Sequence, residues 1–368
     1  MTAQKLTLND LNRTLLARQL LTQRADISVI DAVERVVGLQ SQIPNPPYIG
    51  LWTRIANFQK SDLTRLMDER QIVRCALFRS TLHLITQADH HRFHQVIEPA
   101  LIKGLRSFHG RNIEGLDIPP LIQAIIPFLD EAPRSMGEIG KFLQKIEPNR
   151  EPEALNYVIR TYLPLVQIPP AGTWGAGSKA SYVTAKNWVG MDEPADVGAL
   201  FLRYLAGYGP ASVSDFQTWT GMTKLGEAVE ALKPQLRVFV DDMGKELYDL
   251  PDMPYPAPEM PLPVRFIPEY DNLLIAHTDR TRILPEEHRK KVFLTAGRVL
   301  STILVDGFVA GVWKIEINKR QAKLVITPFV TLSSDQQGAL IAEGERLTRF
   351  VADNAEVITI EFSQTDYA

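Results

Sequence analysis

The chain has 368 residues, of which 45% are hydrophobic and 23% are charged, and its formal net charge is -3 at pH 7. This length is more than one hydrophobic core usually organises, so we expect two to four structural modules. The composition excludes a disordered or fibrous chain, and the slightly negative charge means that affinity for nucleic acid must come from local basic patches.

The sequence predicts neither a membrane helix nor a secretory signal. No apolar run approaches the roughly 20 residues that a membrane helix needs, and the first residues lack the basic, apolar and small-residue order of a signal peptide. The single cysteine, Cys75, has apolar neighbours, so we predict a small core residue rather than a nucleophile. We therefore expect a cytoplasmic protein in a reducing compartment.

The first part of the chain predicts helices followed by a small hairpin. Helices are expected over residues 8–23, 28–42, 48–58 and 62–70, and strands over 72–78 and 81–86. Asp26 or Ser28 is a candidate cap for the second helix, and Arg79 and Ser80 separate the two strands. This order is typical of a winged helix.

The same order of elements recurs twice. The second copy has helices over 119–130, 135–146 and 153–163, then strands over 165–170 and 181–185 around a glycine-rich tip. The third copy has helices over 195–209, 212–221 and 223–234 and strands over 236–242 and 246–250. Because the copies share negligible sequence identity, the repeat is inferred from element order alone.

A fourth module follows a stretch with seven prolines between Pro251 and Pro268, which we interpret as a stiff linker. Beyond it, strands are expected over 301–307, 308–317, 322–329 and 356–362, with a helix over 336–353. The fold class is therefore α+β. We place the module boundaries at 1–112, 113–192, 193–255 and 256–368.

Gln40 and Gln42 stand where the second predicted helix ends, just before Pro44. Residues two apart point in opposite directions on a helix but share a face on an extended segment. Because Pro44 disfavours helical geometry at Ile43, we expect the helix to loosen near Gln42 and both amides to converge. A glutamine amide has one acceptor and two donors but does not ionise near neutral pH. The pair either orients a water without acting as a strong base, or it caps a helix end.

Six segments of the chain resemble, in order, the AlkZ-like winged-helix DNA glycosylases, and the resemblance runs from about residue 8 to about residue 350. The segments are GLQSQIPNPPYIGLWTRI, RCALFRSTLHLI, GTWGAGSKASYVTAKNWVG, RYLAGYGPASVSDFQTWTG, IPEYDNLLIAHTDRTR and LVDGFVAGVWK. The resemblance implies three tandem winged helices in a C-shaped scaffold around a DNA-sized channel. It also implies that the family's catalytic glutamine-x-glutamine motif falls on Gln40 and Gln42. The family usually has an apolar middle residue, whereas this chain has Ser41.

The same resemblance implies a monofunctional glycosylase that removes N7-alkylated purines, including bulky adducts and interstrand crosslinks, and leaves abasic sites. An N7-alkylated purine is cationic and already a good leaving group, so the enzyme must mainly stabilise the sugar and place a water. Two neutral amides suit that chemistry. We expect double-stranded DNA as the partner, a monomer, and no cofactor.

Four further residues are candidates for DNA contact. The glycine-rich tip resembles the family's lesion-probing hairpin, and its Trp174 and Lys179 either contact bases and phosphate or belong to an ordinary hairpin whose Trp174 packs sideways. Arg79, at the first wing, and Arg54, near the glutamines, are phosphate-contact candidates, although a surface arginine without a ligand is the commoner outcome.

Two polar clusters each have a structural explanation beside a functional one. His90, His91 and His94 suggest a metal site, but a third ligand of suitable type is not evident, so we predict a solvated helix face and no metal. Asp271 and Asp279 belong to a polar cluster in the fourth module. They are channel candidates, and a structural salt-bridge network explains them equally well.

A winged-helix transcription regulator without catalytic activity is the main alternative. Such a protein usually presents a basic recognition helix, yet residues 153–163 carry only Arg160, and acidic residues alternate with the lysines of 223–234. A third possible function, a scaffold that binds partner proteins through its winged helices, is not excluded by the sequence. Product analysis on alkylated DNA distinguishes the three, because only a glycosylase leaves abasic sites.

Overall fold

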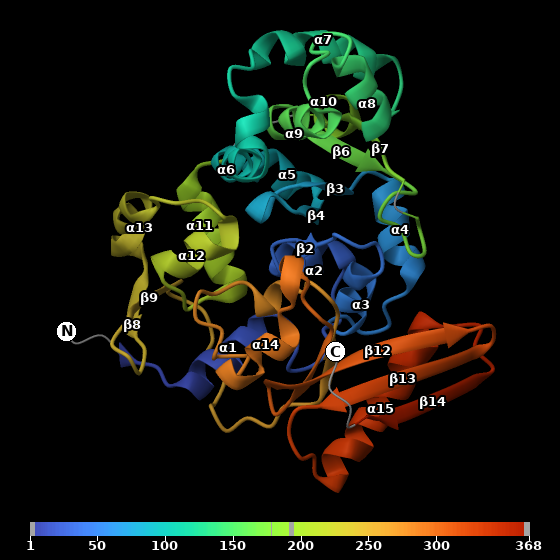
Figure 1. Ribbon diagram of the computed structural model, residues 1–368. Coiled ribbons are helices and arrows are strands. Elements are labelled where there is room, and N and C mark those ends of the chain that lie inside the picture. The colour runs from blue at the N-terminus through green and yellow to red at the C-terminus, as the bar shows by residue number, and fades with distance from the viewer. Residues whose placement is uncertain (1–3, 178, 191–194, 364–368) are drawn as a thin grey trace.

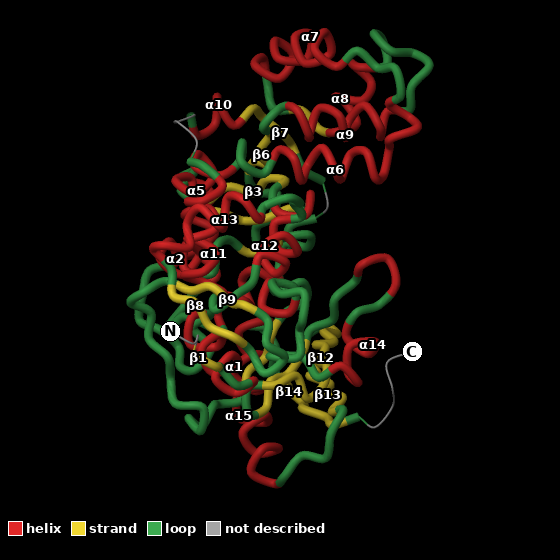
Figure 2. The backbone as a smooth tube through the Cα atoms, turned by 90° about the vertical axis from the view of Figure 1, so that its left-hand side faces the viewer, coloured by secondary structure: helices red, strands yellow, loops and turns green. Residues whose placement is uncertain are grey.

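The computed structural model describes residues 4–177, 179–190 and 195–363 (Figure 1). Helices and strands alternate along the whole of that part, and the strands form three separate sheets, which confirms the predicted α+β class. In Figure 2 the molecule is elongated, with α7 to α9 at one end and the C-terminal sheet at the other.

The N-terminal segment contains α1 to α6. Its elements are β1 (Gln4–Lys5), α1 (Leu8–Arg18), α2 (Val29–Arg35), β2 (Leu39–Gln40), α3 (Pro46–Trp52), α4 (Lys60–Asp68), β3 (Ile72–Ala76), β4 (Leu82–Thr86), α5 (Gln87–Phe93) and α6 (Glu98–His109). Ser28 caps α2 by accepting from the backbone N–H of Asp31, as expected. A short 3₁₀ turn, η1 (Phe78–Ser80), joins β3 to β4.

The prediction of a helix over 28–42 is wrong in its second half. α2 ends at Arg35, and Val37 (φ 53°) and Gly38 (φ 82°) then adopt left-handed backbone conformations that stop a helix. The chain continues as the short strand β2. Gln40 therefore ends a short strand and Gln42 lies in the bend after it, and neither residue is at a helix end.

The middle of the chain contains two further helical segments, each followed by a strand pair. The first has α7 (Ile118–Glu131), β5 (Arg134–Ser135), α8 (Met136–Leu143), α9 (Pro152–Tyr162), β6 (Leu165–Ile168), β7 (Ser181–Thr184) and α10 (Ala185–Val189). The second has α11 (Val197–Tyr208), α12 (Val213–Thr220), α13 (Gly226–Leu232), β8 (Arg237–Val240) and β9 (Glu246–Asp249).

The C-terminal segment is a five-stranded sheet with one long helix on it. It comprises β10 (Arg265–Ile267), η4 (Asn272–Leu274), α14 (Arg289–Val292), β11 (Thr302–Val305), β12 (Phe308–Asn318), β13 (Gln321–Pro328), α15 (Ser334–Val351) and β14 (Val357–Phe362). Leu340 and Leu347 of α15 are buried in one core with Phe266 and Leu324 of the sheet. This apolar contact fixes the helix on the sheet.

Sheet pairing connects segments that are distant in sequence. The six-stranded sheet has the order β2-β4-β3-β6-β7-β5, so strands from both sides of residue 112 share one sheet through the β3–β6 pair. The N-terminal β1 pairs in parallel with β8. β2 is an edge strand beside β4, and this edge carries Gln40.

Candidate active site

Gln40 ends strand β2 at the edge of the six-stranded sheet, and Gln42 lies two residues later, in a bend. Gln40 pairs with His83 of β4 in antiparallel register, and one residue later the Ser41 N–H donates to the Leu82 carbonyl over 2.7 Å. Gln40 is buried, whereas Gln42 is exposed. Both amides are nonetheless held at the connection between β3 and β4, Gln40 by Arg79 and Gln42 by Leu82, so their side chains converge on one region.

The Gln40 side chain is held by Arg79. The Arg79 Nη2 atom donates to Gln40 Oε1 over 2.9 Å and to Asn272 Oδ1 over 3.1 Å. Its Nη1 atom donates to the Trp219 carbonyl over 2.5 Å. Arg79 itself has left-handed backbone geometry (φ 55°), and so does Ser80 (φ 59°). This unusual turn directs the guanidinium inward, toward Gln40, rather than along the wing.

All of these Arg79 acceptors are uncharged. Within the part of the chain that the structure describes, no carboxylate forms an ion pair with Arg79. Burial lowers the pKa of Arg79 to about 10, so the side chain keeps its positive charge at neutral pH. The site therefore contains a partly buried cation without a counter-charge of its own.

His83 is the neutral neighbour of that cation. Burial, and after it the charge of Arg79, lowers the pKa of His83 to about 3. The His83 Nδ1 lies 3.1 Å from the Thr81 carbonyl, which can only accept, and the Nε2 lies 3.5 Å from Arg79 Nη2. The neutral ring thus donates from Nδ1 and presents its Nε2 lone pair to the arginine.

The Gln42 amide has a different partner. Its Oε1 accepts from the Leu82 backbone N–H over 2.9 Å. Because Leu82 N–H and Arg79 can only donate, the oxygen of both glutamine side chains is identified by its partner. Among the described residues, neither glutamine Nε2 has a hydrogen-bond partner. Each amide therefore keeps two donors and one acceptor lone pair for a ligand.

Arg74 of β3 fixes the backbone between the two glutamines. Its Nε donates to the Ser41 carbonyl over 3.0 Å and to the Ser41 hydroxyl over 3.1 Å, and its Nη1 donates to Gln167 Oε1. Gln167 lies on β6 and donates to the Tyr182 hydroxyl over 2.6 Å. Ser41, the departure from the family's usual apolar residue, is thus a polar contact of Arg74.

The prediction that Arg54 contacts phosphate is corrected by its surroundings. Arg54 is 1% exposed, and its Nη1 and Nη2 atoms donate to both carboxylate oxygens of Asp271 over 2.8 and 2.9 Å. It also donates to the Gln19 and Gly50 carbonyls. Asp271 is buried in the same pair, so neither residue is available to line a channel. Their role is structural, as the salt-bridge interpretation proposed.

The glycine-rich hairpin lies against the protein rather than standing free. The Trp174 ring packs edge-on against Tyr48 and Phe350, each with ring centroids 5.6 Å apart, and Lys60 Nζ lies 4.3 Å above it. The sideways packing that the sequence left open is thus observed, and contact of the partly exposed Trp174 with a base stays a prediction. Lys179 is exposed and stays a candidate for phosphate contact, and its neighbour Ser178 lies outside the described residues.

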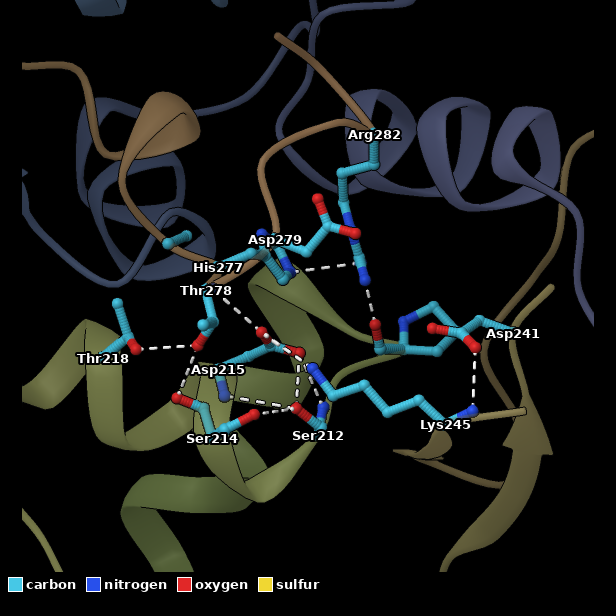
Figure 3. A network of polar contacts seen from close by, with 12 residues as sticks. Ser212, Ser214, Asp215, Thr218, Asp241, Lys245, His277, Thr278, Asp279 and Arg282 are labelled. Atoms are coloured by element: carbon cyan, nitrogen blue, oxygen red, sulfur yellow. Dashed lines mark hydrogen bonds and ion pairs between the residues drawn. The ribbon is translucent and has the colours of Figure 1, made fainter. Parts of the chain in front are cut away.

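Asp279 lies in a loop beside a network that joins α12 to the C-terminal segment (Figure 3). Its Oδ1 accepts from the Thr281 N–H over 2.9 Å and from the Thr281 hydroxyl over 2.8 Å, so the exposed carboxylate closes a turn. The central group of the network is Asp215, which accepts from the Thr278 N–H. Burial opposes ionisation of Asp215, but His277 and Arg282 lower its pKa below the ordinary range. A channel role for Asp279 stays a prediction.

The histidine cluster is not the solvated helix face that the sequence predicted. His90, His91 and His94 are all buried, and the rings of His90 and His94 stack with centroids 4.9 Å apart. Burial lowers the pKa of His90 to about 3. Within the described residues, no group of three or more potential ligands is arranged to hold a metal ion. Cys75 is buried nearby, and burial raises the pKa of its thiol to about 12, as suits a core residue.

Sequence reasoning missed three residues at this site, namely His83, Asn272 and Arg74. Asn272 lies next to Asp271 in η4, accepts from Arg79, and donates to the Gly38 carbonyl over 3.1 Å. Its only sequence signal was its place beside Asp271. His83 and Arg74 lie on the predicted strands around Arg79, and their alternation with apolar residues was the signal that could have found them.

Over the described residues, no helix is both long and apolar enough to cross a bilayer.

Residues 33–350 match the family described as DNA glycosylase AlkZ-like. A relative from Streptomyces sahachiroi, named interstrand DNA cross-link repair glycosylase, is 23% identical over 344 residues, which cover 85% of this chain and 88% of the relative. The solved structure of the Streptomyces sahachiroi DNA glycosylase AlkZ shares the fold, with a TM-score of 0.82 and 19% identity, over 98% of this chain and 100% of that one. The chain belongs to the AlkZ-like family and is a DNA glycosylase.

Proposed function

We propose that this glycosylase is monofunctional, hydrolyses the N-glycosidic bond of N7-alkylated purines in double-stranded DNA, and leaves abasic sites. The observation that carries the proposal is the pair of oriented amides on Gln40 and Gln42, each with unused donors. The name of the Streptomyces relative supports the inclusion of interstrand crosslinks among the substrates. We propose bulky adducts as further substrates. Family membership favours this activity over a transcription regulator.

The proposed architecture is three tandem winged-helix modules in a C-shaped scaffold, followed by an α+β module. We divide them at 1–112, 113–192, 193–255 and 256–368. Each of the first three contains helices followed by a strand pair, namely β3–β4, β6–β7 and β8–β9, which supports the division. We propose that the protein acts as a monomer, and its DNA substrate suggests a cytoplasmic enzyme.

The proposed reaction requires little acid catalysis. As the C1′–N9 bond breaks, its electron pair neutralises the cationic purine, and the positive charge passes to the sugar. A water oxygen then forms the new bond to C1′ and loses a proton to solvent. Placement of the water and stabilisation of the sugar are electrostatic tasks that a neutral amide can perform.

Gln42 is the residue that we assign to the water. One lone pair of its Oε1 is used by Leu82 N–H, and the second can accept from a water, which leaves the water's own lone pairs free for attack. Gln40 Oε1 is already bonded to a cation, so we assign Gln40 a supporting role toward the sugar and its nucleotide. Exposure of Gln42 and burial of Gln40 support this division of work.

For the DNA backbone we retain Arg79 and Lys179 as phosphate contacts. Arg79 carries an unbalanced positive charge beside the amides, and a phosphate is the anion that the substrate brings. A phosphate next to the target nucleotide would then complete the coordination of the guanidinium. Arg54 is withdrawn from this set because Asp271 occupies its side chain, whereas the partly exposed Trp174 stays the proposed base contact of the hairpin.

The decisive test is single-turnover excision of N7-methylguanine by Gln42→Ala. Loss of one water-orienting group should reduce the rate by on the order of a hundredfold, with little change in melting temperature because the side chain is exposed. Gln40→Ala should resemble it, and the double variant should be little worse than either single variant if the amides act as one unit.

The matched control is Gln337→Ala, which removes another exposed glutamine whose amide bonds to a backbone group, here the Leu332 carbonyl. It should excise at the parental rate. Gln42→Glu keeps the shape and adds a base, so it should retain more activity than Gln42→Ala. Parental rates in both alanine variants, with both folded, would remove the chemistry from this pair. Abasic product from bulky and crosslinked duplexes then tests the substrate range.

A further inference from the structure

Helix α6 buries one face of its middle, is exposed over most of its last turn, and lies against the η1 turn. An added Cβ at Gly104 would lie 2.7 Å from the Ser80 Cβ and 2.8 Å from its hydroxyl oxygen. Ser80 directly follows Arg79, which holds Gln40. The absence of a side chain at Gly104 therefore lets the helix backbone pack directly beside the candidate active site.

Phe108 continues this face of α6 beyond the protein. Leu101 and Leu105 are buried, and Phe108 follows at helical spacing, four residues after Gly104 on the same side. Its side chain is nevertheless 70% exposed. The helix face that packs on Ser80 at Gly104 is thus exposed to solvent one turn later, about 6 Å further along the helix axis.

Aromatic rings connect Phe108 back to the site. The Phe108 and His109 rings lie 6.0 and 5.0 Å, between centroids, from the ring of Tyr157 on α9. The Tyr157 hydroxyl is 3.1 Å from the Ser80 hydroxyl. These contacts support the base of the exposed ring and leave its outer face open.

The second half of α6 and the 3₁₀ turn that follows it (Gly110–Ile113) are positively charged. Residues 103–111 contain Lys103, Arg106 and Arg111 and no acidic residue. Lys103 is exposed, and its Nζ donates to the Gly221 carbonyl over 3.3 Å. Gly221 packs onto the backbone of Arg79, since an added Cβ would lie 3.0 Å from the Arg79 Cα. A cation and an open aromatic ring beside one site complement a phosphate and a base.

We propose that the end of α6 binds the DNA strand next to the target nucleotide, with Phe108 stacked on a neighbouring base and Lys103 on a neighbouring phosphate. This inference rests on the proposed role of Gln40 for the position of the target. Successive nucleotides of one strand lie about 3.4 Å apart along the duplex, so one turn of α6 spans about two nucleotides. The end of α6 can thus reach about two nucleotides of the strand, and the neighbours on either side of the lesion are the positions to probe.

The stacking can be measured with 2-aminopurine placed one or two nucleotides to either side of the lesion. The full chain is bound to duplexes with 2′-fluoro-N7-methyldeoxyguanosine, whose electron-withdrawing fluorine slows excision. At one of these positions the parental protein should quench the fluorescence, Phe108→Trp should keep the quenching, and Phe108→Ala should lose it. Phe108→Ala should also raise Kd about tenfold. Met243→Ala, which removes an 89% exposed apolar side chain elsewhere, should change neither.

Lys103→Ala tests the phosphate contact. The slope of log affinity against log salt should fall by about one, whereas Arg349→Ala, an exposed arginine of α15, should leave it unchanged. Parental fluorescence and affinity in Phe108→Ala, or a parental slope in Lys103→Ala, would overturn the surface assignment. Because both readouts measure binding, they hold or fail whether or not Gln42→Ala loses excision, so the two proposals fail separately.

Discussion

Arg54 and Arg79 are both withdrawn from the open surface, but the protein balances their charges in different ways. Arg54 donates to both oxygens of Asp271 and to two backbone carbonyls. Arg79 donates to Gln40, to Asn272 and to the Trp219 carbonyl, none of which is charged. The charge of Arg54 is balanced by a carboxylate within the fold, and the charge of Arg79 is not.

This difference separates a structural arginine from a functional one better than burial does. A buried cation with a carboxylate partner loses little by being enclosed, whereas a cation among neutral dipoles keeps a field that favours an incoming anion. In the proposed function, a DNA phosphate is that anion. The two regions are also adjacent, because Asp271 and Asn272 follow each other in the chain and serve one arginine each.

The largest effect is expected on stability, at the buried ion pair of Arg54 and Asp271. Arg54→Met should lower the free energy of unfolding by about 3 to 5 kcal/mol, because it leaves the Asp271 carboxylate buried without a partner. Urea denaturation measures the loss. Arg65→Met, which breaks the exposed pair with Glu69, should cost less than about 1 kcal/mol. A loss of similar size in both variants would mean that the Arg54 pair is not the enclosed contact described above.

Arg79 should respond in the opposite way, with activity falling more than stability. Arg79→Met removes the charged hydrogen bond to Gln40, which is worth about 1.5 to 3 kcal/mol, so single-turnover excision at saturating DNA should fall roughly 10- to 150-fold. Arg79→Lys keeps the charge without the fork and should lie between. An unfolding loss as large as that of Arg54→Met, with excision by the folded fraction unchanged, would make the two arginines equivalent after all.

Much of the fold could be predicted from sequence because its longer elements have clear periodicity. The helices and strand pairs between residues 118 and 249 lie close to their predicted ranges. α6 was missed, since Pro99 and an interior Gly104 weaken the helical pattern, and the packing against Ser80 that requires this glycine is tertiary. The early end of α2 depends on left-handed backbone at Val37, a residue type that does not suggest it.

The site was predictable only in part, for a related reason. The glutamine pair could be located from its own motif. Its partners could not, because Arg79 and Asn272 are 193 positions apart, and Arg54 and Asp271 are 217 apart. Whether an arginine pairs with a carboxylate or with an amide depends on such distant contacts. The sequence therefore led to the same prediction, a phosphate contact, for Arg54 and for Arg79.

The smallest predicted effect tests the comparison most directly, because Asn272→Asp gives Arg79 the carboxylate that Arg54 has. The new ion pair should balance the guanidinium and reduce its attraction for a phosphate, so the slope of log affinity against log salt should fall by about one. Excision at saturating DNA should fall only several-fold, since the hydrogen bond to Gly38 is lost at a cost of about 1 kcal/mol. Asn272→Ala is the control for charge: it also removes the bond to Gly38, and it removes the acceptor for Arg79 instead of charging it, so it should show a modest loss of rate and a parental slope. If Asn272→Asp kept the parental slope as well, Arg79 would not meet a phosphate, and its function would be confined to holding Gln40. A reduced slope in Asn272→Asp alone would mean that the missing counter-charge, rather than the position of the arginine, is what makes this region bind DNA.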